Sequence, residues 1–151
     1  MPRTTRPFVI RSSPMQGRGA FATRVIPAGV RLVEYGGERL TPAQSDRRYP
    51  DGDNARHHTF LFAIDDDVVI DASVGGYIAR WINHSCDPNC DAVVEDSRIW
   101  IDTLRRIRPG EELSYDYAYV LNGPHTAAAK ALYPCYCGAK KCRGTILANK
   151  R

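Results

Sequence analysis

The sequence lacks the features of a membrane-spanning or exported protein. Its apolar runs, such as residues 68–72 and 119–121, are only a few residues long, whereas a membrane-spanning helix needs about 20. The N-terminal stretch "MPRTTRPFVIRSSP" contains no apolar segment of the kind that a secretory signal carries. We therefore expect a protein that does not enter a membrane and that works in a reducing, intracellular compartment.

A concentrated charge of one sign is also missing. The formal net charge is only +4, and the basic stretches at 104–110 and 139–143 are short and have no interleaved aromatic residues. We therefore expect no direct binding to nucleic acid. The acidic stretch "IDDDVVID" at 64–71 has two interpretations: a surface that attracts a basic peptide, or a turn between two strands.

Helix signals are scarce, while strand signals are short and frequent. Only "TPAQSDRRY" (41–49), with a capping Thr before Pro, and the Ala-rich stretch 126–133 favour helices. Segments rich in β-branched and aromatic residues, separated by Gly, Pro, Asp and Asn, predict strands. These segments are 8–12, 19–23, 30–35, 59–65, 68–72, 91–95 and 98–102, with hairpin turns at 65–67 and 95–97. The fold class predicted is mostly β.

Three of the five cysteines lie close together in the C-terminal part, which changes character near residue 120. Cys135, Cys137 and Cys142 can turn toward one point, but a tetrahedral zinc site needs four ligands. Cys86 and Cys90 are the remaining candidates. Disulfides are disfavoured in a reducing compartment, and three clustered thiols cannot pair off evenly. We therefore favour zinc over free thiols, and over a Cys–His nucleophile in "NHSC".

Four stretches occur in the order and at the spacing of one known pattern. They are residues 17–40, "RWINHSCDPNC" (80–90), "PGEELSYDY" (109–117) and "CYCGAKKC" (135–142). Together they resemble the SET-domain protein lysine methyltransferases that carry a post-SET zinc motif, in a small free-standing form. The resemblance implies small curled β-sheets with a C-terminal pseudoknot. It also implies a SET domain over 8–119 and a zinc-binding post-SET segment over 120–151.

The resemblance implies methyl transfer from S-adenosylmethionine to a lysine amine of a protein. It assigns Cys86 as the fourth ligand of a structural zinc, beside Cys135, Cys137 and Cys142, and leaves Cys90 as a small buried residue. Gly residues permit a close approach of the backbone to a ligand. The implied cofactor-binding residues are Gln16, Gly17, Arg18, Gly19, Phe60, Asn83, His84 and Tyr136. Phe60 stands where relatives often have Tyr, and Tyr136 takes the place of an aromatic that many relatives carry after the last cysteine.

The resemblance also implies a lysine channel walled by tyrosines, because ammonium groups interact well with aromatic faces. Tyr35, Tyr115 and Tyr117 match the channel positions, and Tyr117 matches the catalytic tyrosine. A phenol of ordinary pKa about 10 is protonated at neutral pH, so we expect Tyr117 to orient and stabilise rather than to act as a base. A hydroxyl at Tyr115 indicates a preference for monomethylation, with some dimethylation.

The substrate that the resemblance implies is a protein with a lysine in an extended segment, and a histone tail is the first candidate. A basic non-histone protein is the alternative within the same activity. A catalytically silent SET-like module that only binds a peptide is an alternative of another class. The joint presence of Asn83, His84, Tyr115 and Tyr117 argues against the silent module, since binding alone does not need all of them.

Overall fold

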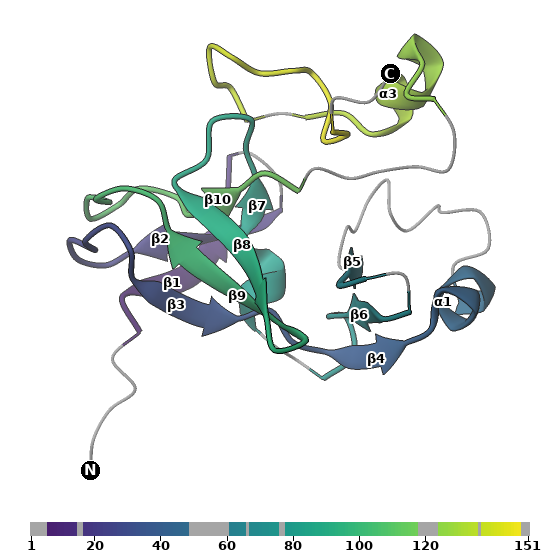
Figure 1. The fold of residues 1–151 in the computed structure, drawn as a ribbon. Coiled ribbons are helices and arrows are strands. Elements are labelled where there is room, and N and C mark those ends of the chain that lie inside the picture. The colour runs from purple at the N-terminus through teal and green to yellow at the C-terminus, as the bar shows by residue number, and fades with distance from the viewer. Residues whose placement is uncertain are drawn as a thin grey trace.

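Short β-strands make up most of the regular structure (Figure 1). The computed structural model describes residues 6–14, 17–48, 61–65, 67–75, 78–117, 124–135 and 137–148. Within these ranges the elements are β1 (Phe8–Ser12), β2 (Arg18–Ala22), β3 (Arg31–Glu34), β4 (Glu38–Leu40), α1 (Pro42–Arg48), β5 (Leu61–Ala63), β6 (Val69–Asp71), η1 (Ile78–Trp81), β7 (Asn83–His84), β8 (Cys90–Glu95), β9 (Arg98–Thr103), β10 (Ser114–Tyr115) and α3 (Ala127–Leu132). None of the helices in these ranges is long and apolar enough to cross a membrane. The prediction of a mostly β chain is confirmed.

The strands form small separate sheets rather than one large one. β1 pairs with β2, β9 lies between β3 and β8, and β6 lies between β4 and β5, all antiparallel. The predicted hairpin turns join β5 to β6 and β8 to β9. At the second turn, Asp96 and Ser97 both have positive φ (53° and 59°), the conformation that a two-residue hairpin loop needs. At the first turn, the Asp65 carboxylate accepts hydrogen bonds from the amides of Asp67 and Val68.

One pair of strands joins two distant motifs. β7 and β10 run parallel, with Asn83 opposite Ser114 and His84 opposite Tyr115. Residues 80–90 therefore lie beside residues 109–117, as the resemblance implied. Each strand is only two residues long, and neither was among the strands that the sequence pattern predicted.

The main core lies between these sheets. Ile82, Ile99, Ile101 and Leu113 are fully buried, and so is Cys90, which confirms its expected place as a small buried residue. A second, smaller cluster of Tyr133, Ile146 and Leu147 packs against Tyr117, Ala129 and Cys135. The C-terminal segment thus makes only a small core of its own, and this core borders β10.

Both predicted helices are present and have side-chain caps. The Thr41 hydroxyl accepts from the Gln44 amide (3.1 Å), while the Gln44 side chain accepts from the Thr41 amide (2.8 Å). This reciprocal pair satisfies two donors at the start of α1. At its other end, Arg48 pairs with the buried carboxylate of Asp71 (3.0 Å), which ties α1 to β6. Thr126 caps α3 in a similar way by accepting from Ala129.

Candidate functional site

Four aromatic rings from distant parts of the sequence pack in a row. Tyr35, which follows β3, lies 5.5 Å from Phe62 of β5, measured between ring centroids. Phe62 lies 6.4 Å from Tyr115 of β10, and Tyr115 lies 4.8 Å from Tyr117. The three predicted channel tyrosines therefore share one site. Phe62 was not predicted, although strand alternation places residues 60, 62 and 64 on one face.

The Tyr35 hydroxyl is buried, and no hydrogen bond to a described residue compensates for the loss of water around it. Its side chain is almost fully enclosed, and its oxygen finds no hydrogen-bond partner in the described part of the chain. Burial raises the pKa of Tyr35 and of Tyr115 well above the ordinary tyrosine value, so both phenols are neutral at physiological pH. Because a buried polar group normally has a partner, an orphaned hydroxyl in an aromatic cluster indicates a polar ligand.

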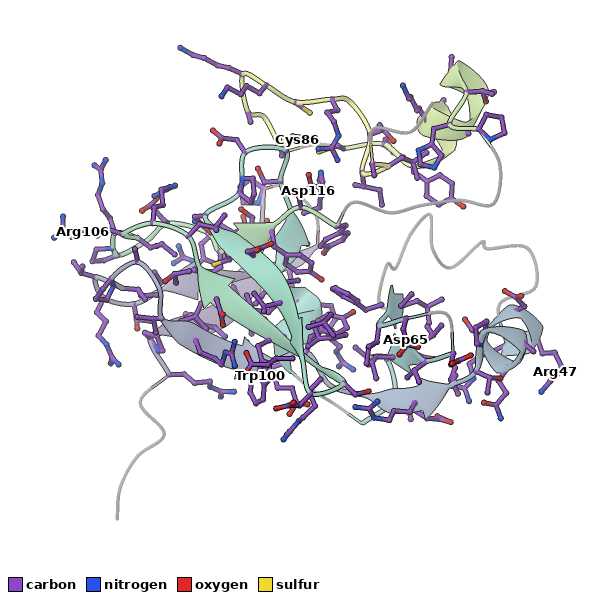
Figure 2. All side chains as sticks on the ribbon, in the orientation of Figure 1. Arg47, Asp65, Cys86, Trp100, Arg106 and Asp116 are labelled. Carbon is purple, nitrogen blue, oxygen red and sulfur yellow. The ribbon has the colours of Figure 1, made fainter. Side chains whose placement is uncertain are left out.

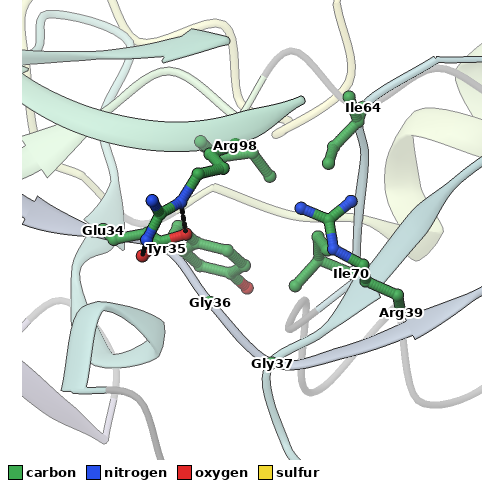
Figure 3. Close-up of a pocket in the computed structure, with 9 residues that line it drawn as sticks. Glu34, Tyr35, Gly36, Gly37, Arg39, Ile64, Ile70 and Arg98 are labelled. Carbon is green, nitrogen blue, oxygen red and sulfur yellow. Dashed lines mark hydrogen bonds and ion pairs between the residues drawn. The ribbon is translucent and has the colours of Figure 1, made fainter. Parts of the chain in front are cut away.

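Tyr35 also lines a cavity of about 210 Å³ (Figure 3). Arg98, at its rim, pairs with Glu34 (2.6 and 2.9 Å), and Arg39 donates to the Ser97 carbonyl. The buried ring of Tyr35 therefore borders open space, which a side-chain channel requires. The full lining is Glu34, Tyr35, Gly36, Gly37, Arg39, Ile64, Ile70, Arg98 and Ile99.

Tyr117 is fixed by three contacts with the β7 segment. Its hydroxyl donates to the Ile82 carbonyl (2.7 Å), its amide donates to His84 Nδ1 (3.0 Å), and its ring packs edge-on against the His84 ring. Burial lowers the pKa of His84 to about 4, although Asp116 opposes the shift. The imidazole is therefore neutral at physiological pH, as an Nδ1 that accepts a hydrogen bond requires.

Four of the eight predicted cofactor residues, Gly17, Arg18, Gly19 and Asn83, lie close together beside β7. Gly17 has a positive φ of 48°, and Arg18 and Gly19 begin β2. The Asn83 side-chain amide donates to the Arg18 carbonyl (2.9 Å) and to the Glu112 carboxylate (2.8 Å). The side chain of His84 instead turns inward, toward Tyr117 and Cys86. The predicted positions Gln16, Phe60 and Tyr136 lie outside the described residues.

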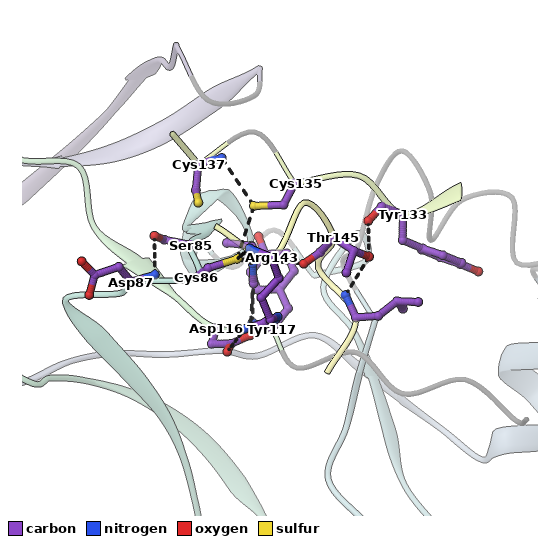
Figure 4. A network of polar contacts seen from close by, with 12 residues as sticks. Ser85, Cys86, Asp87, Asp116, Tyr117, Tyr133, Cys135, Cys137, Arg143 and Thr145 are labelled. Atoms are coloured by element: carbon purple, nitrogen blue, oxygen red, sulfur yellow. Dashed lines mark hydrogen bonds and ion pairs between the residues drawn. The ribbon is translucent and has the colours of Figure 1, made fainter. Parts of the chain in front are cut away.

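Four thiols converge on one point, and Figure 4 shows three of them, those of Cys86, Cys135 and Cys137. The sulfur atoms of Cys86, Cys135, Cys137 and Cys142 all lie within 4.8 Å of one another, while Cys90 is buried elsewhere in the core. Burial acts to raise the pKa of Cys137, but surrounding N–H and S–H donors outweigh it and bring that pKa down to about 6. A four-thiol set of this compactness fits tetrahedral zinc, which prefers thiolate ligands.

The structure also tests the Cys–His nucleophile that the sequence left open. His84 Nε2 lies 3.4 Å from Cys86 Sγ, close enough to serve as its partner. However, burial raises the pKa of Cys86, whereas an activated nucleophile has a lowered pKa. The same sulfur is also a member of the four-thiol cluster. The geometry therefore favours Cys86 as a member of a cluster that could hold a metal ion over Cys86 as a nucleophile.

An ion pair connects the thiol cluster to the tyrosines. Arg143, which follows Cys142, forms a two-pronged salt bridge with Asp116 (2.8 and 3.0 Å), and its amide donates to Cys86 Sγ (3.2 Å). Asp116 lies between Tyr115 and Tyr117 in the sequence. Figure 2 shows Cys86 and Asp116 beneath the C-terminal segment. Sequence reasoning missed this pair, because single charged residues usually indicate a solvated surface.

Comparison with known proteins points in one direction. The SET domain family matches residues 17–118. The histone-lysine N-methyltransferase trithorax of Drosophila virilis is 41% identical over 135 residues, which is 87% of this chain and 3% of that protein. Human histone-lysine N-methyltransferase 2B is 42% identical, over 87% of this chain and 5% of its own length. A Saccharomyces cerevisiae histone-lysine N-methyltransferase described as H3 lysine-4 specific is 37% identical, over 93% of this chain and 13% of its own length. The chain thus spans a small fraction of these relatives.

Proposed function

Since the chain belongs to the SET-domain family, we propose that it transfers a methyl group from S-adenosylmethionine to a lysine amine of a histone tail. The observation that carries this proposal is the buried row of Tyr35, Phe62, Tyr115 and Tyr117, with an orphaned hydroxyl at one end. Aromatic faces suit an ammonium and its methylated forms, and the hydroxyl suits an amine. The histone assignment rests on the names of the relatives, and a basic non-histone protein is the alternative substrate.

The reaction is an in-line displacement, in which the amine nitrogen bonds to the methyl carbon while the carbon–sulfur bond breaks. The protein's contribution is positional: aromatic walls confine the lysine, exclude water and hold the nitrogen on the line of attack. Burial beside a cation also lowers the pKa of an amine, which promotes the unprotonated, attacking form. Because Tyr117 donates its hydroxyl proton to Ile82, its oxygen presents lone pairs as weak acceptors for polarised methyl hydrogens.

We assign the donor molecule to the side of β7 opposite the lysine. The residues present fit it: Gly17 and Gly19 allow a close backbone approach, and Asn83 is held beside them. Both ring nitrogens of His84 contact protein groups, so we assign its contribution to its backbone. The remaining assignments are Arg18 and the predicted positions Gln16, Phe60 and Tyr136.

We assign zinc a structural role, since a closed four-cysteine site leaves no open coordination position. Ligation of Cys86 together with three cysteines of the 120–151 segment fastens that segment over β7 and β10. The salt bridge between Arg143 and Asp116 then links the attached segment to the stretch that contains Tyr115 and Tyr117. Since thiolate ligands require reducing conditions, we place the activity in a reducing compartment, or on chromatin when the substrate is a histone.

The proposal is tested by transfer of labelled methyl from S-adenosylmethionine to a mixture of purified histones and cell lysate. We expect label on the lysine of a histone band, identified by mass spectrometry of the labelled peptide. Label confined to another basic protein would overturn the histone assignment and leave the enzyme class intact. No label together with no measurable affinity for S-adenosylmethionine would make a silent peptide-binding module the better interpretation.

Replacing Tyr115 with phenylalanine is expected to change the product rather than abolish the reaction. Tyr115 packs against both Phe62 and Tyr117, and its hydroxyl can hold a water molecule where a further methyl group would need to sit. The wild-type protein should yield mainly monomethyl-lysine with some dimethyl-lysine, and Y115F should raise the degree of methylation. Mass spectra of the peptide product over time provide the measurement, and an unchanged product distribution would contradict the assignment.

A further inference from the structure

Glu112 has no role in the site described so far, although it lies within it. Residues 111–113 run beside β2, where Ala22 donates to the Glu111 carbonyl (2.9 Å) and Leu113 donates to the Ala20 carbonyl (2.8 Å). Asn89 donates to the Glu112 carbonyl from the other side (2.9 Å). The backbone of Glu112 is therefore held in place, and its half-buried side chain points toward Ser13, Gly19 and Asn83.

The carboxylate of Glu112 keeps its present position only because residue 19 has no side chain. A Cβ added at Gly19 would lie 2.1 Å from Glu112 Oε2, too close for two nonbonded atoms, so the carboxylate would have to move away from its present partners. Gly19 does not have a positive φ, so its backbone conformation does not demand glycine. The carboxylate lies in the space that a side chain at position 19 would occupy. A ligand that approaches the backbone at Gly19, as expected, therefore also approaches the carboxylate of Glu112.

The charge of this carboxylate is not neutralised by a cation in the described part of the chain. Its partners are neutral donors: the Ser13 hydroxyl, 2.8 Å from each oxygen, and the Asn83 amide, 2.8 Å from Oε2. No Lys, Arg or His of the described ranges lies within ion-pair distance of it. A half-buried carboxylate with only neutral partners attracts a cationic ligand.

Glu112 also fixes the orientation of Asn83. The Asn83 amide nitrogen donates to both Glu112 and the Arg18 carbonyl, so the nitrogen faces the protein. The carbonyl oxygen of the same amide therefore faces the opposite way, as an acceptor. The hydrogen bond to the anionic Glu112 polarises the Asn83 amide and strengthens that acceptor.

We propose that Glu112 is a positioning residue of the cofactor site, which orients and polarises Asn83 toward the α-ammonium group of S-adenosylmethionine and places a negative charge behind it. This inference rests on the proposed function. The spent cofactor, S-adenosylhomocysteine, keeps the same ammonium group. The role of Glu112 therefore concerns the binding of both molecules and not the chemistry of the sulfur.

The test is calorimetric binding of S-adenosylhomocysteine, and of the analogue that lacks its α-amino group, to wild type and E112Q. The glutamine keeps the size of the side chain and removes its charge. We expect E112Q to bind S-adenosylhomocysteine about tenfold more weakly, the effect expected when a charged hydrogen-bond partner is neutralised. Affinity for the deaminated analogue should stay within about twofold of wild type, since no ammonium is present for the charge to act on.

Glu111 offers a matched control. It is the neighbouring glutamate, and its carboxylate pairs with Arg105 (3.0 Å). E111Q should bind both ligands as wild type does. If E112Q does not fold, S13A removes the hydroxyl donor from the same carboxylate, and we expect it to weaken binding of S-adenosylhomocysteine alone by about threefold.

The outcomes separate this inference from the proposed function. An equal loss of affinity for both ligands would make Glu112 a purely structural residue and overturn the inference. An unchanged affinity of E112Q for S-adenosylhomocysteine would overturn it as well. A wild-type protein that binds neither ligand would instead refute the proposed function, and the inference with it.

Discussion

Replacing Cys142 with serine is expected to abolish zinc binding and to lower methyl transfer at least about 100-fold, while the sheets of residues 8–117 stay folded. The sulfur of Cys142 is one of four within 4.8 Å, and a serine hydroxyl is a poor substitute for a thiolate ligand of zinc. Loss of the metal should release the segment that follows residue 134. Asp116 would then lose its salt bridge to Arg143, beside Tyr115 and Tyr117.

Order-of-magnitude free energies indicate that the C-terminal segment depends on zinc. The C-terminal cluster buries only Tyr133, Ile146 and Leu147, which contributes about 5–9 kcal/mol. Fixing the backbone of residues 135–148 costs at least about 14 kcal/mol of conformational entropy. The deficit of at least about 5–9 kcal/mol lies within what a structural zinc can supply, since its apparent binding free energy is about 10–16 kcal/mol in small peptides. The segment therefore needs the metal in order to stay in place.

Cys90 provides the matched control, because it is the one cysteine of the chain outside the thiol cluster. C90A should keep one zinc per chain and most of the activity, at a stability cost of about 1 kcal/mol for the small cavity. Zinc content, methyl transfer and thermal unfolding would be measured on C142S, C90A and wild type in the same buffer. Full activity of zinc-free C142S would show that the segment holds itself in place.

Replacing Tyr117 with phenylalanine is expected to lower kcat/KM for methyl transfer by about 100- to 1000-fold, the range found when one oriented polar group is removed from a reaction site. The Tyr117 hydroxyl is held at 2.7 Å from the Ile82 carbonyl, so its oxygen is fixed before any substrate arrives. The phenyl ring and its contacts with Tyr115 and His84 remain in the variant. Cofactor affinity and zinc content should therefore stay close to those of wild type.

The comparison with Y115F makes this prediction specific, because both variants lose one phenolic oxygen from the same short segment. Y117F should fail in rate, whereas Y115F should differ mainly in product. Single-turnover transfer of labelled methyl to a histone-tail peptide, together with calorimetric affinity for S-adenosylhomocysteine, measures both properties. An equal loss of rate in the two variants would falsify the distinct role of Tyr117.

Sequence reasoning succeeded where the signal is local. The hairpin at Asp96 and Ser97 follows from turn residues between two strand patterns, and α1 follows from a capping Thr before Pro. The convergence of Cys135, Cys137 and Cys142 follows from their short spacing. In each case, residues close together in the chain carry the information, so composition and spacing were sufficient.

Sequence reasoning failed where two residues meet across a long separation without a repeating pattern. Strand patterns did not show the pairing of β7 with β10, since it involves only two residues on each side; only the resemblance to the SET family implied that these two stretches lie side by side. The salt bridge of Arg143 with Asp116 and the placement of Glu112 depend on that pairing. Each of these charged side chains, taken alone in the sequence, has the appearance of an ordinary surface residue.

The parallel pairing of β7 with β10 also determines when this site can form during folding. In the sequence, the β8–β9 hairpin lies between β7 and β10. Its contacts are mostly local, so it can form early. Pairing of Asn83 with Ser114 must wait until that hairpin has closed, and the last cysteine, Cys142, leaves the ribosome later still. A nascent chain that stops before residue 135 can therefore assemble its sheets and still lack the covering segment. The emergence of residues 135–142 from the ribosome, rather than folding of the sheets, therefore determines when all four clustered cysteines can meet.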